Sequence, residues 1–160
     1  MTEKPTMNNE IAEKPEEYKL TLDIVKELWA KTYNTDGKPD WSHILPYYDE
    51  EIHFRDTIQE LHGMEDFKAM TERLTKRSKG LKMELLKVMQ DENDFFIEWI
   101  MTIQFKKYPN SNMYGASRLT INDKGKIVDQ RDYYDLWGDI FDNIPRFGKR
   151  YRRFMKRKFG

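Results

Sequence analysis

The sequence contains no cysteine, which excludes disulfides, thiol nucleophiles and thiolate metal sites. No apolar run approaches the roughly 20 residues that span a bilayer. A glycine-rich phosphate loop, a nucleophile elbow and a dinucleotide fingerprint are also missing. The chain starts M-T-E-K-P and lacks the apolar segment of a signal peptide. These absences predict a cytoplasmic protein, and we expect no cofactor.

Length and charge set the outer bounds. At 160 residues the chain is long enough for one domain with a proper core, plus tails. Its formal charge is zero, but eight of its 28 Lys and Arg residues lie in residues 146–160, which contain no acid. The other 20 stand against 28 Asp and Glu residues, a net of −8. A basic tail on an acidic body can bind its own domain, a partner subunit, a membrane surface or nucleic acid.

The spacing of apolar residues predicts an α+β fold in which helices and strands are segregated. We expect a disordered tail at residues 1–15, a domain at 16–140, and a basic aromatic helix or tail at 141–160. The predicted helices are 16–33, a short one capped by Asp40 or Ser42, and 64–74 with Gly80 as its terminator. The predicted strands are 51–57, 81–90, 94–107, 112–122 and 126–135.

The last two predicted strands form a hairpin with an unusual carboxylate. N-D-K-G is a tight turn in which Gly125 is free to take positive φ. Asp132 lies inside the following strand, next to Tyr133 and Tyr134. An aspartate in mid-strand is unfavourable by propensity and costly if buried. Asp132 therefore faces either water or a cavity in which it does chemistry.

Two motifs in this element order resemble the nuclear transport factor 2-like superfamily. They are Y-Y-D-E-E-I-H-F-R-D at 47–56 and G-K-I-V-D-Q-R-D-Y-Y-D-L at 125–136. Within that superfamily, the chain is similar to SnoaL-like polyketide cyclases, ketosteroid isomerases and limonene epoxide hydrolases. The resemblance covers roughly residues 18–140. It implies a cone-shaped fold in which a curved antiparallel sheet wraps around an N-terminal helix.

The epoxide-hydrolase resemblance implies a catalytic role for Asp132, which matches a catalytic carboxylate of those enzymes. Those enzymes also place an Arg and an Asp two residues apart on the strand that matches 94–107. Trp99 and Met101 stand at these positions here, so two members of that triad are missing.

The ketosteroid-isomerase resemblance implies a second catalytic candidate, Asp56, at the position of the general base. The oxyanion tyrosine of that family falls at about Trp29, and its protonated aspartate falls at about Ser117. The chain therefore keeps one carboxylate from each family and the full set of neither.

Strand alternation predicts one inward face that lines an apolar, aromatic cavity suited to a small hydrophobic molecule. The expected lining residues besides the two aspartates are Trp29, Tyr33, Phe54, Trp99, Met101, Ser117, Leu119, Gln130 and Tyr134. A carboxylate facing such a cavity has a raised pKa and can act as general acid or base. One interpretation is a cofactor-independent isomerase, cyclase or hydrolase that uses Asp132. The alternative is a non-catalytic ligand-binding or scaffold protein, in which Asp132 only orders the cone.

Three expectations concern partners and metals. Ile100, Ile127 and Tyr133 fall on the outer face among charged residues, which suits a homodimer interface. The three histidines are not spaced as a metal site, so no metal is expected. Aromatic residues recur in 146–159 at helical spacing, and a helix there would pack on the domain or a dimer mate. Contact of 146–160 with nucleic acid or an anionic membrane is the less favoured alternative.

Overall fold

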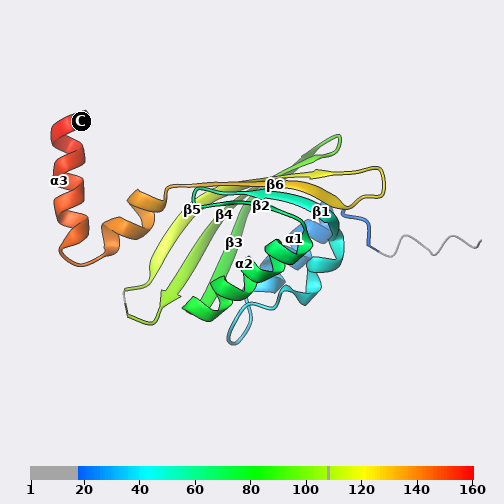
Figure 1. The fold of residues 1–160 in the computed structure, drawn as a ribbon, viewed down its shortest axis with the longest axis horizontal. Helices are drawn as coiled ribbons and strands as arrows, with labels where there is room; N and C mark the ends of the chain where they lie inside the picture. The colour runs from blue at the N-terminus through cyan, green and yellow to red at the C-terminus, as the bar shows by residue number, and fades with distance from the viewer. Residues whose placement is uncertain (1–17, 108) are drawn as a thin grey trace, which may run out of the picture.

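The structure, a computed structural model, describes residues 18–107 and 109–160. The predicted tail at residues 1–15 lies outside the described residues. The fold is α+β, as predicted, with a six-stranded curved, unclosed sheet and helices α1 and α2 against one of its faces (Figure 1). The strands are β1 (Tyr48–Arg55), β2 (Glu60–His62), β3 (Ser78–Asp91), β4 (Asp94–Phe105), β5 (Ser111–Ile121) and β6 (Ile127–Tyr134). The helices are α1 (Leu22–Tyr33), α2 (Met64–Arg77) and α3 (Phe147–Phe159).

The strand order is β2-β1-β6-β5-β4-β3. Neighbours from β3 to β6 pair antiparallel, as the hairpin pattern predicts, and so do β1 and β2. β1 pairs with β6 in parallel, so the sheet is mixed rather than wholly antiparallel. A parallel pair needs a long crossover, and here α2 and four strands separate the two partners in sequence.

The first helix begins later than its apolar spacing suggested. Thr21 caps it by accepting a hydrogen bond from the Ile24 amide, so α1 starts at Leu22 rather than near residue 16. At its other end the Asn34 side chain pairs with the backbone of Met83, donating one hydrogen bond of 2.7 Å and accepting one of 2.9 Å. The Asn34 side-chain amide thus makes the same pair of hydrogen bonds with β3 that the backbone of a neighbouring strand makes, and it fixes the end of α1 on β3.

Other predicted boundaries shift for local reasons. Asp40 does cap a short helical segment, which is split into two 3₁₀ turns, Trp41–His43 and Leu45–Tyr47. The helix from Met64 continues to Arg77, and Gly80 lies in β3 instead of ending the helix. Gly125 takes φ +75° in the predicted turn.

The core lies between the inner face of the sheet and the two helices. Ile97, Trp99, Met101 and Ile103 all point inward from β4 and are buried, as alternation predicts. Ile127 was expected on the outer face, but it is fully buried. The pairing of β5 with β6 is irregular between Thr120 and Ile121, and this irregularity changes which residues of β6 face inward.

The C-terminal segment extends away from the body of the molecule (Figure 1). A π-helical turn, η3 (Leu136–Ile140), and a 3₁₀ turn, η4 (Phe141–Asn143), lead into α3. The aromatic rings of Trp137, Phe141, Phe147 and Tyr151 pack against one another in stacked, tilted and edge-on pairs, and Arg152 pairs with Asp142. The contacts of α3 are therefore chiefly with η4.

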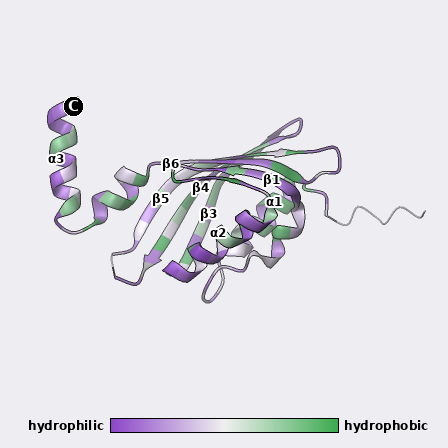
Figure 2. Ribbon diagram, in the orientation of Figure 1, coloured by the Kyte–Doolittle hydropathy of each residue, from purple (hydrophilic) through white to green (hydrophobic). Residues whose placement is uncertain are grey.

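Gly148 fixes how α3 sits on η4, because a Cβ at this position would collide with the backbone of Asp142. The helix is strongly amphipathic, with alternating hydrophilic and hydrophobic bands in Figure 2. Phe154 remains 47% exposed and Phe159 77% exposed, so the apolar face is only partly covered. Among residues 18–107 and 109–160, no helix is both long and apolar enough to cross a membrane.

Truncation after Pro145 tests how far the body depends on α3. Because α3 packs chiefly on the turn before it, we expect the melting temperature of the remaining domain to fall by less than about 4 °C, which corresponds to roughly 1 kcal/mol. Circular dichroism measures this change. A drop of ten degrees or more would contradict the prediction and make α3 part of the core. Loss of salt-sensitive sedimentation with anionic vesicles in the truncated protein would assign α3 to a membrane surface instead.

Candidate active site

A cavity of about 470 Å³ opens between the inner face of the sheet, α1 and α2. Its lining contains ten of the eleven residues singled out from the sequence: Trp29, Tyr33, Phe54, Asp56, Trp99, Met101, Ser117, Gln130, Asp132 and Tyr134. Leu119 does not line it; this side chain is fully buried in the hydrophobic core. The wall is mainly aromatic and aliphatic, which suits an apolar ligand.

Asp132 is held from one side by its neighbours in the sheet. The Ser117 hydroxyl, on the cross-strand partner of Asp132, donates to Oδ1 at 2.6 Å, and the Gln130 amide donates to the same oxygen at 2.9 Å. Trp99 Nε1–H donates to Ser117 Oγ at 2.9 Å, and the Tyr48 hydroxyl donates to Gln130 Oε1 at 2.5 Å. These bonds fix the orientation of the carboxyl group.

The second oxygen of Asp132 is differently placed. Among the described residues, no donor reaches Oδ2, and the side chain lines the cavity. Burial raises the pKa of Asp132 from 3.8 to about 6, although the hydrogen bonds from Ser117 and Gln130 act to lower it. The charge of Asp56 raises it further. Asp132 therefore offers a free oxygen that can gain or lose a proton near neutral pH.

Asp56 has a structural position at the cavity rim. Its Oδ1 accepts hydrogen bonds from the amides of Ile58 and Gln59 and so closes the turn between β1 and β2. Its Oδ2 accepts from the Tyr134 hydroxyl at 3.1 Å. Burial, followed by the charge of Asp56, raises the pKa of Tyr134, so that this phenol stays neutral. The site thus brings both predicted carboxylates to one cavity but gives them different surroundings.

Tyr33 supplies a further polar group to the cavity. Its side chain is buried at the end of α1, and its hydroxyl has no hydrogen-bond partner among the described residues. Burial raises the pKa of Tyr33 well above its usual range, and the charge of Asp132 adds to this effect. A neutral tyrosine hydroxyl in this place can donate to an oxygen of a bound molecule.

Sequence reasoning missed two cations and one tyrosine of the cavity. Arg73 and Arg77 line it from α2, and both side chains are exposed, which places them toward the open end. Their spacing of four residues puts both on one face of α2, and this spacing could have been read from the sequence. Tyr48 is buried next to Phe67, with ring centroids 4.7 Å apart, and its role depends on a contact with Gln130 that no local pattern encodes.

Trp99 closes the wall beside Asp132. Its ring lies directly over Gly115, its cross-strand partner, where a Cβ would collide with the indole. Only glycine leaves room for the indole in the position from which it donates to Ser117. Met101, two residues along, presents a thioether to the cavity rather than a charge. Trp99 and Met101, which the resemblance aligned with the charged pair of the epoxide hydrolases, thus present an indole N–H and an apolar side chain to the cavity.

A family model for the SnoaL-like domain matches residues 27–130. The chain belongs to the SnoaL-like family. No curated protein matches it. The match spans the cavity walls from α1 to Gln130 and ends two residues before Asp132.

Solved structures share the fold of this SnoaL-like chain at low sequence identity. A hypothetical protein with a ketosteroid isomerase-like fold from Catenulispora acidiphila, in complex with trimethylamine, is 16% identical with a TM-score of 0.65, and the match covers 78% of this chain and 93% of that one. An LEH-like epoxide hydrolase from M. tuberculosis is 14% identical with a TM-score of 0.62, covering 82% and 94%. A putative SnoaL-like polyketide cyclase from Jannaschia sp. is 17% identical with a TM-score of 0.59, covering 71% and 84%. These likenesses confirm the nuclear transport factor 2-like fold.

Asp132→Asn tests the buried carboxyl through the pH dependence of stability. Because the folded-state pKa is raised from 3.8 to about 6, the stability that Asp132 contributes is fully present below pH 3.8 and is lost as the pH rises through 6. Asparagine cannot ionise. The free energy of unfolding of Asp132→Asn minus that of wild type should therefore increase by about 1–3 kcal/mol between pH 4 and pH 7.5.

Urea unfolding at a series of pH values measures this difference. Asp123→Asn, in the exposed β5–β6 turn, is the matched control and should show a flat difference. A difference that falls with rising pH would mean that Asp132 is stabilised as a carboxylate in an ion pair, which contradicts the assignment.

Proposed function

We propose that this protein binds a small hydrophobic molecule in the cavity and acts on it with Asp132 as general acid or base, without a cofactor. The observation that carries the proposal is the Asp132 carboxyl, with one oxygen fixed by Ser117 and Gln130 and the other free in an apolar cavity. Its pKa of about 6 suits proton transfer near neutral pH.

The proposed reaction class is a proton transfer next to a carbonyl, as in an isomerisation or cyclisation. Asp132 Oδ2 takes a proton from carbon, and the Tyr33 hydroxyl donates a hydrogen bond to the oxygen on which negative charge develops. Return of the proton from Asp132 to another carbon completes an isomerisation, so atoms and charge balance without a further reactant. Hydrolysis is a second possibility for the same carboxylate, with Oδ2 activating a water molecule.

The cavity also suggests which molecules fit. Its walls are apolar, while Arg73 and Arg77 stand at the open end. A ligand with an apolar body and a polar or anionic end would place the body against Trp29 and Trp99 and the polar end near the guanidinium groups. The alternative function, non-catalytic binding of the same class of molecule, uses the same contacts but no proton transfer.

Asp132→Asn also separates these two functions. A panel of hydrophobic ketones and epoxides is first screened by thermal shift, and turnover of the ligands is followed by chromatography. For a catalytic Asp132 we expect kcat to fall by about 10²–10⁴-fold while the ligand Kd changes little. Asp123→Asn is again the control. Unchanged turnover in a folded Asp132→Asn variant would exclude the catalytic role, and binding without any turnover in wild type would favour the non-catalytic function.

The homodimer remains part of the proposal. Phe96, Tyr114 and Tyr133 are exposed on neighbouring strands of the outer sheet face, and Arg118 and Arg131 lie in the same cross-strand row as Phe96. An aromatic patch with charged surroundings suits a self-complementary interface. The cytoplasmic location expected from the sequence likewise stays a proposal.

Light scattering tests the dimer directly. At about 20 μM we expect twice the monomer mass of 19.4 kDa, and Tyr114→Glu should shift the protein toward monomer, because it buries an unpaired charge in the interface. Phe159→Glu, at the far end of α3, should leave the dimer intact. A wild-type protein that runs as a monomer at this concentration contradicts the proposal.

A further inference from the structure

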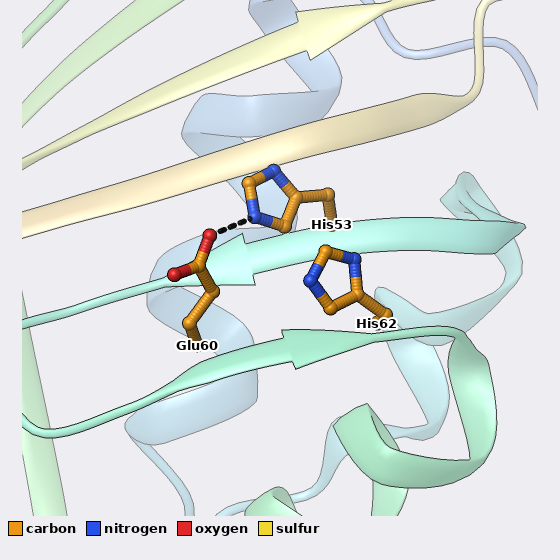
Figure 3. Close-up of side chains that lie close together, drawn as sticks. All are labelled: His53, Glu60 and His62. Atoms are coloured by element: carbon orange, nitrogen blue, oxygen red, sulfur yellow. Dashed lines mark hydrogen bonds and ion pairs between the residues drawn. The ribbon is translucent and has the colours of Figure 1, made fainter.

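The outer face of β1 and β2 carries a cluster of possible metal ligands that is independent of the cavity. His53 on β1 is the direct cross-strand partner of His62 on β2, and the two rings stack with centroids 4.6 Å apart. Glu60 lies two residues before His62 and therefore on the same face of β2 (Figure 3). Phe54, next to His53, points into the cavity, so the cluster faces the other way.

The three side chains form a compact donor set. One ligand atom from each of His53, Glu60 and His62 can be chosen so that all lie within 4.8 Å of one another. His53 Nε2 and Glu60 Oε1 are 2.8 Å apart. Two ligands at tetrahedral zinc distances are roughly 3.3 Å apart, so an ion between them needs an opening of only about half an ångström. Glu60 and His62 are exposed and can make such a movement without disturbing the core.

His53 is already oriented as a metal-binding histidine usually is. Its Nδ1 lies 2.8 Å from Asp129 Oδ2 on β6, and Asp129 Oδ1 accepts from Arg118 at 2.6 Å. A carboxylate behind one ring nitrogen fixes the tautomer, holds the ring and makes the other nitrogen the better ligand. That other nitrogen, Nε2, points at Glu60 (Figure 3).

The third ligand is free to bind. His62 is exposed, and its ring nitrogens have no hydrogen-bond partner among the described residues. We propose that His53, Glu60 and His62 bind one divalent transition-metal ion of the zinc type, with Asp129 as the carboxylate behind His53. Two imidazoles and a carboxylate are a set that zinc accepts, and exposure of the cluster leaves a fourth position for water.

A metal ion bound here would restrain the β1–β2 turn at the cavity rim. β2 is an edge strand of three residues, and the turn that joins it to β1 contains Asp56 and Gln59, both of which line the cavity. An ion bound to both strands ties this turn to the sheet. The site is therefore a clamp at the entrance of the cavity, whatever molecule the cavity binds.

Calorimetric titration with ZnCl₂ tests the site on full-length protein that carries no histidine tag and has been dialysed against a chelator. We expect one zinc ion per chain, with at least tenfold weaker binding in His62→Ala and in Glu60→Gln. His43→Ala is the matched control, because His43 also contacts a carboxylate, Asp40 at 3.2 Å, but has no third ligand nearby among the residues that the structure describes. This variant should bind zinc as wild type does.

Two results of the zinc titration would overturn the site. One is the absence of a saturable one-to-one event in wild type; the other is equal loss of binding in His43→Ala and His62→Ala. Circular dichroism verifies the fold of each variant. The visible absorption of Co²⁺ gives a test that needs no variant, because wild type should show the intense bands of a four-coordinate ion. Only the weak bands of hydrated cobalt would reject the site.

Discussion

The hydrogen-bonded path that ends at Asp132 Oδ1 organises the inner face of the sheet. Trp99 on β4 donates to Ser117 on β5, which donates to Asp132 on β6, and Tyr48 at the start of β1 reaches the same carboxyl through Gln130. Four strands thus contribute to the position of one oxygen. A carboxyl group buried without such partners would cost several kcal/mol. With them, its pKa rises only to about 6, so the group stays ionisable near neutral pH.

Much of this site follows from strand periodicity. Side chains alternate strictly along a strand, so fixing the inward face of β4 places Trp99 and Met101 together, and the pairing of β5 with β6 sets Ser117 opposite Asp132. The predictions fail where the alternation is interrupted, and where an inward-facing side chain packs in the core instead of lining the cavity. Ile127 turns inward beside a register irregularity. Leu119 faces inward as predicted but packs in the hydrophobic core instead of lining the cavity, and alternation alone cannot tell these two places apart.

Contacts between segments distant in sequence could not be read from local pattern. β2 has three residues, too few for an alternation signal, and its pairing with β1 brings His53 and His62 together although their spacing suggests no metal site. Asp129 and Arg118, which hold His53 from behind, belong to the β5–β6 hairpin, more than 60 residues later in the sequence. The helical period of 146–159 does predict α3, but the surface it contacts depends on the irregular turns at 136–143, which no periodicity describes.

The side chains of Trp99 and Met101, the two positions that the resemblance to epoxide hydrolases singled out, bear on which chemistry fits best. Opening an epoxide needs an acid for the leaving oxygen as well as a base for water, and Met101 provides neither. Proton transfer next to a carbonyl needs one base and one donor to the oxygen. Asp132 supplies the first, and the Tyr33 hydroxyl, neutral and without a partner among the described residues, supplies the second. The proposed isomerase or cyclase chemistry therefore needs only these two groups, both of which line the cavity.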